Sequence, residues 1–126
     1  MKTEDYLFLL KTVKNPKPNR EYSIKFTFPE FTSICPVTGK PDFAEIKIEY
    51  TPDELLLEQV SVEAYLQQYR NDKIYMEAVT NKILDDFNAV ITPKWMRITI
   101  DFSRREGMFY TVSAQVENDD ILDFLK

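Results

Sequence analysis

The chemistry that this sequence suggests is centred on Cys35, the only cysteine among 126 residues. A thiol acts as a nucleophile only as its thiolate, so it needs a base or a positive electrostatic field beside it. Asp42, seven positions further on, could take the thiol proton and return it to an intermediate. A structural interpretation stays open, in which Cys35 is a small buried hydrophobic residue and Asp42 caps a turn.

The residues around Cys35 read FTSICPVTGKPDF from position 31 to position 43. This stretch resembles the queuosine-pathway nitrile reductase family, whose members carry FTSxCPxTGQPDF, and it departs from that pattern at Lys40. The similarity continues more weakly through residues 50–53, 69–71, 77, 81–86 and 93–96. The resemblance implies that Cys35 adds to the nitrile of 7-cyano-7-deazaguanine to form a covalent thioimide. It also implies that Asp42 handles the protons and that NADPH reduces the adduct to the aminomethyl base.

The same resemblance implies two substrate-binding glutamates. In the family, a glutamate of the second helix recognises the purine-like edge of the substrate, and Glu77 matches it. A carboxylate suits that edge because it accepts hydrogen bonds from ring and exocyclic nitrogens. Glu58 matches a further family glutamate, at the head of the next motif. The alternative interpretation of Glu77 is an exposed helix residue that binds nothing.

The cofactor motif departs from the family. Residues 58–65 read EQVSVEAY, so Val60 and Glu63 stand where the reductases have two lysines. This change removes two positive charges and adds a negative one, which opposes binding of the NADPH phosphates. Ser61 is the remaining candidate for a cofactor contact. No phosphate-binding glycine pattern compensates, because the chain has only two glycines.

Those losses leave two alternatives beside the NADPH-dependent reductase, which the breadth of the match favours. A sister group that resembles the reductases, the amidinotransferases of archaeosine formation, keeps the cysteine and the aspartate but lacks the lysines. Its members form the same thioimide on nitrile-bearing tRNA, and ammonia then attacks it without any nicotinamide. The other alternative is a non-catalytic relative that binds a deazapurine. Two more departures weaken the match to the reductases. A family histidine beside the substrate glutamate is missing, since Met76 and Ala78 stand on either side of Glu77, and residues 104–107 read RREG in place of PRGG.

Composition limits the other classes of function. The net charge of −5 argues against a broad electropositive surface for nucleic acid. The chain has no histidine and one cysteine, so no metal site is expected. No segment has the length of a membrane span or the pattern of a signal peptide, so a cytoplasmic protein is expected.

Apolar periodicity predicts the elements that position these residues. Residues alternate over 22–28 and 44–50, so the cysteine segment is a loop between two strands. Helical spacing between residues 61 and 87 predicts two helices with a break at 70–72, and alternation returns over 96–102 and 108–114. The order strand, strand, helix, helix, strand, strand predicts an α+β domain with a four-stranded antiparallel sheet.

The predicted domain spans residues 21–116, preceded by an irregular lead-in at 1–20 and followed by an acidic tail at 117–126. The resemblance implies the tunnelling fold, whose subunits associate into closed barrels with active sites at the subunit interfaces. A homo-oligomer is therefore expected, and an open sheet with unprotected edges agrees with it.

Overall fold

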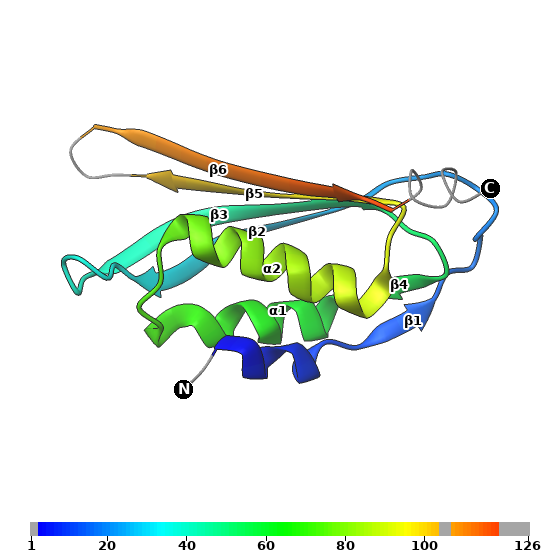
Figure 1. The fold of residues 1–126 in the computed structure, drawn as a ribbon, viewed down its shortest axis with the longest axis horizontal. Helices are drawn as coiled ribbons and strands as arrows, with labels where there is room; N and C mark the ends of the chain where they lie inside the picture. Colours follow the sequence, from blue (N-terminus) through cyan, green and yellow to red (C-terminus); the bar gives the residue numbers. More distant parts are fainter. Residues whose placement is uncertain (1–2, 104–106, 119–126) are drawn as a thin grey trace.

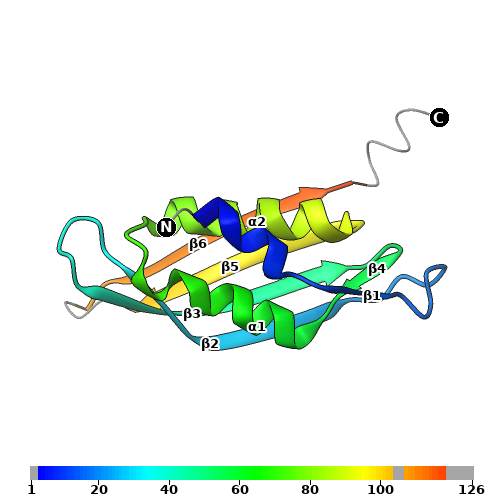
Figure 2. The same ribbon diagram turned by 90° about the horizontal axis from the view of Figure 1, so that it is seen from below.

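The computed structural model describes residues 3–103 and 107–118, apart from the side chains of residues 3–5 and 103. An antiparallel four-stranded sheet with the order β2-β3-β5-β6 forms one layer. Helices α1 (Gln59–Gln67) and α2 (Met76–Ile91) form a second layer on one face of it (Figures 1 and 2). The predicted α+β fold and its element order are confirmed. The strands are β2 (Ile24–Ile34), β3 (Pro41–Thr51), β5 (Trp95–Ser103) and β6 (Phe109–Glu117).

The N-terminal residues differ from the predicted irregular lead-in. They form a 3-10 helix, η1 (Thr3–Leu9), and a short strand, β1 (Thr12–Lys14), which pairs with β4 (Leu55–Leu57) in a separate two-stranded sheet. The ring of Tyr6 packs edge-on against that of Tyr69, with centroids 5.1 Å apart. Elements this short leave no clear periodic pattern in the sequence, and tertiary packing decides their conformation.

The core lies between the sheet and the helices. In the two central strands, every second side chain points at the helix layer, as the period of a strand requires. Three residues of α2 meet them at helical spacing and are fully buried, namely Val79, Ile83 and Phe87. Each such side chain stabilises the fold by about 1.5–3 kcal/mol. The buried residues of the central strands are Ala44, Ile46, Ile48, Tyr50, Met96, Ile98, Ile100 and Phe102.

A β-bulge interrupts the pairing of β2 with β3 between Phe28 and Phe31. Pro29 lies in this bulge, on an edge strand of the sheet, where a residue without a backbone N–H is tolerated. Beyond the bulge, Ser33 pairs directly with Asp42. The additional residue in β2 therefore sets which side chains face each other at the Cys35 end of the sheet.

The connection between the two helices agrees with the predicted break at residues 70–72. Helix α1 continues directly into a 3-10 helix, η2 (Gln68–Asn71), and the backbone becomes extended at Asp72. Helix α2 ends at Thr92, which adopts a left-handed conformation with φ of 41° and precedes Pro93. Proline cannot continue a helix, so this end is fixed by the sequence.

A buried polar network joins the helices. The Tyr65 hydroxyl donates to Asp86 at 2.6 Å and lies 2.6 Å from the Tyr69 hydroxyl, while Lys82 contacts Asp86 at 3.0 Å. Burial raises the pKa of both tyrosines above the usual value, so both hydroxyls remain protonated. Each partner satisfies a group that would be costly to bury alone.

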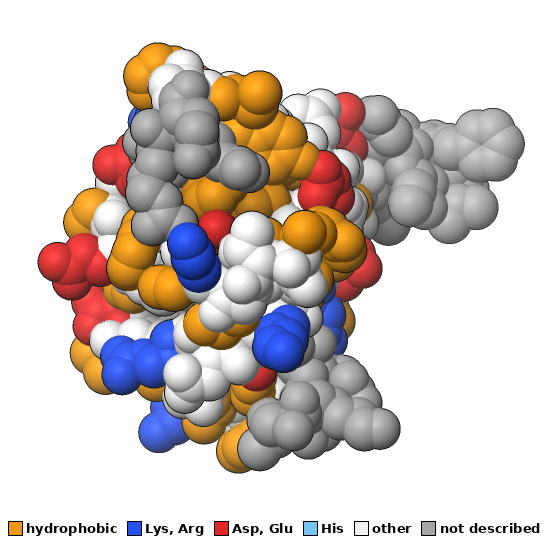
Figure 3. Space-filling view, turned by 90° about the vertical axis from the view of Figure 1, so that its left-hand side faces the viewer, with side chains coloured by type: hydrophobic (Ala, Val, Ile, Leu, Met, Phe, Trp, Pro, Cys, Tyr) orange, Lys and Arg blue, Asp and Glu red, His pale blue; other side chains and the backbone are white. Residues whose placement is uncertain are grey.

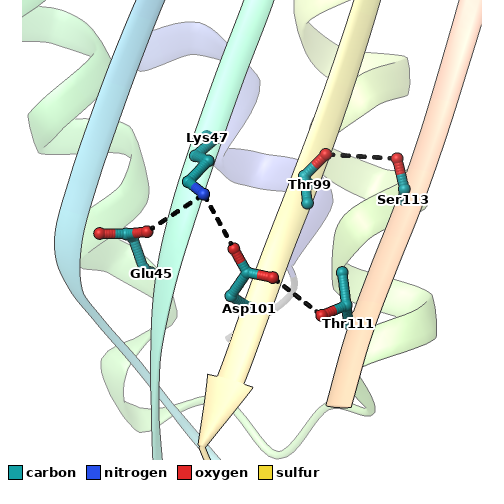
Figure 4. A network of polar contacts seen from close by, with 6 residues as sticks. All are labelled: Glu45, Lys47, Thr99, Asp101, Thr111 and Ser113. Atoms are coloured by element: carbon teal, nitrogen blue, oxygen red, sulfur yellow. Dashed lines mark hydrogen bonds and ion pairs between the residues drawn. The ribbon is translucent and has the colours of Figure 1, made fainter. Parts of the chain in front are cut away.

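The other face of the sheet is polar. Lys47 contacts Asp101 at 3.3 Å and Glu45 at 3.6 Å, and Thr111 donates to Asp101 at 2.8 Å (Figure 4). Hydrogen bonding and charge attraction from Asp101 raise the pKa of Lys47. These contacts run across three strands, so they join β3, β5 and β6 outside the core.

Two further observations bear on the sequence predictions. Of the acidic tail predicted at 117–126, residues 119–126 lie outside the described part of the chain. Within the part that is described, no helix combines the length and the hydrophobicity that crossing a membrane requires.

Candidate active site

The Cys35 loop joins β2 to β3 at one end of the sheet and is closed by its own backbone. The Cys35 N–H donates to the carbonyl of Lys40, and the Gly39 N–H donates to the carbonyl of Cys35, both at 2.9 Å. Gly39 has a φ of 73°, in the left-handed region where a residue without Cβ is favoured. The loop thereby holds a fixed geometry around a partly exposed thiol.

This loop activates the thiol. The Thr38 hydroxyl, the Thr38 N–H and the Val37 N–H all donate hydrogen bonds to Cys35, and they hold its pKa below the usual 9.0. The Lys40 N–H donates to Thr38 Oγ1 at 3.2 Å and so orients that hydroxyl. Sequence reasoning did not identify Thr38, although a threonine three residues after a turn-forming cysteine is a recognisable signal for a side-chain-bonded turn.

Asp42 is half-buried at the start of β3, close enough for its charge to act on Cys35. The negative charge raises the pKa of the thiol, so it opposes the effect of the loop donors. The lowered pKa of the thiol therefore comes from the hydrogen bonds of Thr38 and Val37. A role of Asp42 in proton transfer stays a prediction at this point.

The loop is tied to the connection between the helices. The Ile34 N–H donates to the carbonyl of Asp72 at 2.9 Å, and the Ile74 N–H donates back to the carbonyl of Ile34 at 3.1 Å. Asp72 in turn accepts a hydrogen bond from the Tyr6 hydroxyl at 2.8 Å. The residue before the nucleophile is thus held by the connection at 72–74, which Tyr6 of η1 contacts in turn.

Glu77 lies in the exposed first turn of α2, where the helix dipole favours a negative charge. Its carboxylate accepts a hydrogen bond from the Tyr110 hydroxyl of β6. Tyr110 pairs with Phe102, which pairs in turn with Ala44, so this carboxylate lies at the same end of the sheet as Cys35. The two groups belong to opposite edges, because Cys35 follows β2 whereas Tyr110 belongs to β6.

Glu58 lies at the far end of α1 from the Cys35 loop (Figure 1). Its carboxylate caps this helix, accepting from the N–H of Val60 at 2.7 Å and of Ser61 at 2.9 Å. These two backbone bonds lower its pKa from the usual 4.5. The Ser61 side chain is buried, and its Oγ accepts from the Lys11 N–H at 3.0 Å. Within one chain, then, neither Glu58 nor Ser61 is brought to Cys35.

A groove of about 360 Å³ runs between α1 and β2. Its apolar lining includes Phe26, Phe28 and Val62, while Lys25 and Glu63 supply one charge of each sign. Among the residues that the structure describes, no cluster of three potential metal ligands is found.

Hydrophobic side chains gather around the end that carries Cys35 (Figure 3). Val37 lies within the cysteine loop and is 75% exposed, and Phe43 follows the loop in β3 and is 61% exposed. Phe109, at the start of β6, is 87% exposed. Exposed apolar groups of this size, close to a reactive residue, are typical of a surface that another molecule covers.

These features define a class of small α+β protein, in which an activated cysteine lies at one end of an antiparallel sheet. Comparison with known sequences shows the family. The sequence profile described as "QueF-like protein" matches residues 41–120. The chain belongs to this family.

Similar proteins agree with this assignment. One relative from Nitrosococcus oceani is 47% identical over 106 residues, covering 84% of this chain and 82% of its own. Another, from Chloroherpeton thalassium, is 46% identical over 109 residues, which cover 86% of this chain and 94% of the relative. Both are named NADPH-dependent 7-cyano-7-deazaguanine reductase.

A solved structure shows the same fold. The apo crystal structure of the archaeosine synthase QueF-Like aligns with a TM-score of 0.69, covering 83% of this chain and 98% of the other. The two sequences are 22% identical, so this likeness concerns the fold alone. The predicted tunnelling fold is confirmed.

Proposed function

We propose that this protein is an NADPH-dependent nitrile reductase that converts 7-cyano-7-deazaguanine to 7-aminomethyl-7-deazaguanine through a Cys35 thioimide. The observation that carries the proposal is the activated thiol of Cys35, held beside Asp42 by a rigid loop. The names of relatives at 44–47% identity supply the substrate and the cofactor. A place in the cytoplasm accords with that cofactor and with a tRNA-modification pathway.

The first step is addition of the thiol across the nitrile. The Cys35 thiolate attacks the nitrile carbon and forms a C–S bond, and one π bond of the nitrile becomes an N–H bond. Asp42 receives the proton that the thiol loses and delivers it to that nitrogen, so the net change adds S–H across C≡N. When bound, NADPH supplies the hydrides that reduce the thioimide and free the thiol. In the reduction steps Asp42 passes protons to the same nitrogen.

Glu77 is the proposed recognition group for the deazapurine edge. Its carboxylate can accept hydrogen bonds from a ring N–H and an exocyclic amine together. The Tyr110 hydroxyl holds the carboxylate in place before substrate arrives. Glu58 remains a weaker proposal for a substrate contact, since both of its oxygens cap α1.

The groove between α1 and β2 fits the cofactor in part. Its aromatic and aliphatic lining suits a flat ring, and Lys25 would hold a phosphate. Glu63 opposes that charge, and Ser61 is buried with its hydroxyl already bonded to Lys11. We therefore assign the phosphate contact to Lys25 rather than to Ser61.

We also propose that the active site forms between subunits of a homo-oligomer. Strands lie about 4.8 Å apart, so the β2 and β6 edges of one sheet are separated by about 14 Å. Cys35 follows the β2 edge, and the Glu77 carboxylate is bonded to Tyr110 of the β6 edge, so within one chain the two groups are associated with different edges. Strand β6 runs antiparallel to β2, so continuing the sheet into the next subunit sets Tyr110 of one chain beside Cys35 of another. The exposed Val37, Phe43 and Phe109 would be covered there.

One observation favours an amidinotransferase acting on nitrile-bearing tRNA with ammonia. Val60 is 68% exposed, and Glu63 is exposed on the same helix, so no lysine of α1 is available for a phosphate. The chemistry of Cys35 and Asp42 would be unchanged, because both outcomes begin with the same thioimide. Only the second reactant differs.

Intact mass spectrometry after incubation with 7-cyano-7-deazaguanine tests the proposal, with Cys35→Ala as the control. The wild type should gain the mass of the nitrile, and an NADPH chase should remove it with release of the aminomethyl base. An adduct that persists after the chase, with product formed from nitrile-bearing tRNA and ammonium, would establish the amidinotransferase. No adduct on either substrate would leave only the non-catalytic deazapurine-binding relative.

A further inference from the structure

Ser33 lies two residues before the nucleophile and is 0% exposed. Within residues 3–103 and 107–118, its Oγ is the one buried side-chain nitrogen or oxygen atom without a hydrogen-bond partner. Buried hydroxyls are nearly always bonded, because leaving one unpaired costs the full desolvation of the group. Alanine would fill this place at lower cost, so the hydroxyl calls for an explanation beyond packing.

The sheet places this hydroxyl beside Asp42. Ser33 and Asp42 are direct partners across β2 and β3, and such partners point to the same face with Cβ atoms about 4.5–5.5 Å apart. The pairing depends on the bulge at Pro29, without which Asp42 would face Thr32. The backbone on either side is fixed, since Ile34 is bonded in both directions to the connection between the helices.

We propose that Ser33 is a positioning residue for Asp42, an inference that rests on the proposed function. The Ser33 hydroxyl hydrogen-bonds the Asp42 carboxyl group while the Cys35 thioimide forms. Asp42 then presents its proton to the nitrile nitrogen in one orientation.

A hydroxyl suits this task because it can both donate and accept. It donates to Asp42 when the carboxylate is charged, and it accepts from Asp42 when the acid is protonated. The same side chain therefore holds Asp42 before and after the proton leaves. An amide or a lysine would favour one protonation state over the other.

The test compares the rate of adduct formation with 7-cyano-7-deazaguanine for wild type, Ser33→Ala and Ser33→Thr. At saturating nitrile, Ser33→Ala should be slower by roughly 10- to 100-fold, with an unchanged half-saturating concentration. Ser33→Thr keeps the hydroxyl and should recover most of the rate. Ser113→Ala, which removes a hydroxyl bonded to Thr99 on the polar face (Figure 4), should match wild type.

Unfolding by denaturant separates positioning from folding. Ser33→Ala should be at least as stable as wild type, because it removes a desolvated group that has no partner. A wild-type rate in Ser33→Ala, or a loss of rate that Ser33→Thr does not recover, would overturn the positioning role alone. If the wild type forms no adduct at all, the proposed function is wrong and this inference fails with it.

Discussion

At the scale of single residues, the groups around Cys35 have opposite effects on the pKa of its thiol. Thr38 and Val37 donate hydrogen bonds that favour the thiolate, whereas the charge of Asp42 disfavours it. A catalytic site needs both, since the nucleophile must be charged before attack and a proton must be at hand afterwards. The sequence suggested Asp42 as the base for the thiol. The hydrogen bonds that lower the thiol pKa come instead from the loop, and the proton transfers of Asp42 stay a prediction.

Thr38→Ala should raise the pKa of Cys35, because its hydroxyl is the largest cause of the lowered value. The rate of alkylation by iodoacetamide should then reach half of its maximum at a higher pH than in wild type. Thr38→Ser keeps the hydroxyl and should behave as wild type. Cys35 is the only thiol of the chain, so alkylation reports on this site alone. An unchanged midpoint in Thr38→Ala would contradict the role given to the loop.

Tyr110→Phe should weaken substrate binding, because it frees the Glu77 carboxylate from its partner. Hydrogen bonds to charged groups are among the stronger ones, so the half-saturating nitrile concentration should rise by roughly three- to tenfold. Thr111→Val is the matched control, because the neighbouring residue of β6 points to the other face of the sheet. If both variants weaken substrate binding equally, the weaker binding comes from a change in β6 as a whole and not from the lost hydrogen bond to Glu77.

At the scale of elements, the sequence predicted what periodicity controls. Alternation identified β2, β3, β5 and β6, and helical spacing identified both helices and the break near Asp72. The bulge at Pro29 was not predicted, because one additional residue in an edge strand leaves the alternation on each side intact. The capping role of Glu58 was also missed, since the resemblance drew attention to substrate and glutamate is an uncommon N-cap residue.

The cap makes stability depend on pH. The folded pKa of Glu58 lies below its usual 4.5, so its stabilising effect is present above that value and is lost as the pH falls through the folded pKa. Denaturant unfolding between about pH 6 and pH 3 should therefore show a smaller loss for Glu58→Gln than for wild type. Glu63→Gln, exposed on the same helix, should keep the wild-type dependence. If wild type and Glu58→Gln lose the same free energy of unfolding as the pH falls, the helix cap is not the cause of the pH dependence.

The tyrosine network should matter for folding and little for chemistry. Tyr65→Phe removes the hydroxyl that bonds both Asp86 and Tyr69 inside the core. The free energy of unfolding should fall by about 1–3 kcal/mol, because the buried Asp86 loses a donor. Tyr22→Phe removes a hydroxyl near the surface, bonded to Asn15, and should cost less. Denaturation midpoints of the two variants, measured together, give the comparison.

At the scale of the whole molecule, one chain carries its candidate site residues at opposite edges of its sheet. Cys35 follows β2, and Glu77, in the first turn of α2, accepts a hydrogen bond from Tyr110 of β6. The sequence could name Cys35, Asp42 and Glu77 through the resemblance. It could not show that they lie at one end of the sheet but at different edges, because that depends on the order of the strands.

Complementation tests whether the site is shared between subunits. Cys35→Ala and Glu77→Ala should each be inactive alone. After unfolding and refolding together in equal amounts, about a quarter of the wild-type activity should return, because one site in four then combines two intact residues. The Cys35→Ala protein mixed with Asp42→Ala is the control, since both residues belong to the same loop region. No recovery in the first mixture would place each site within one chain.

The partly exposed thiol of Cys35, whose pKa the loop lowers, also has a consequence for oxidation. Thiolates that solvent can reach are the first to form sulfenic acid, and a neighbouring cysteine often rescues them by closing a disulfide. Cys35 has no such neighbour within these 126 residues. Its sulfenic acid can return to the thiol only through an external thiol such as glutathione, and otherwise proceeds to the irreversible sulfinic form. The loop that makes Cys35 reactive toward a nitrile thus makes the protein dependent on the reducing capacity of its surroundings.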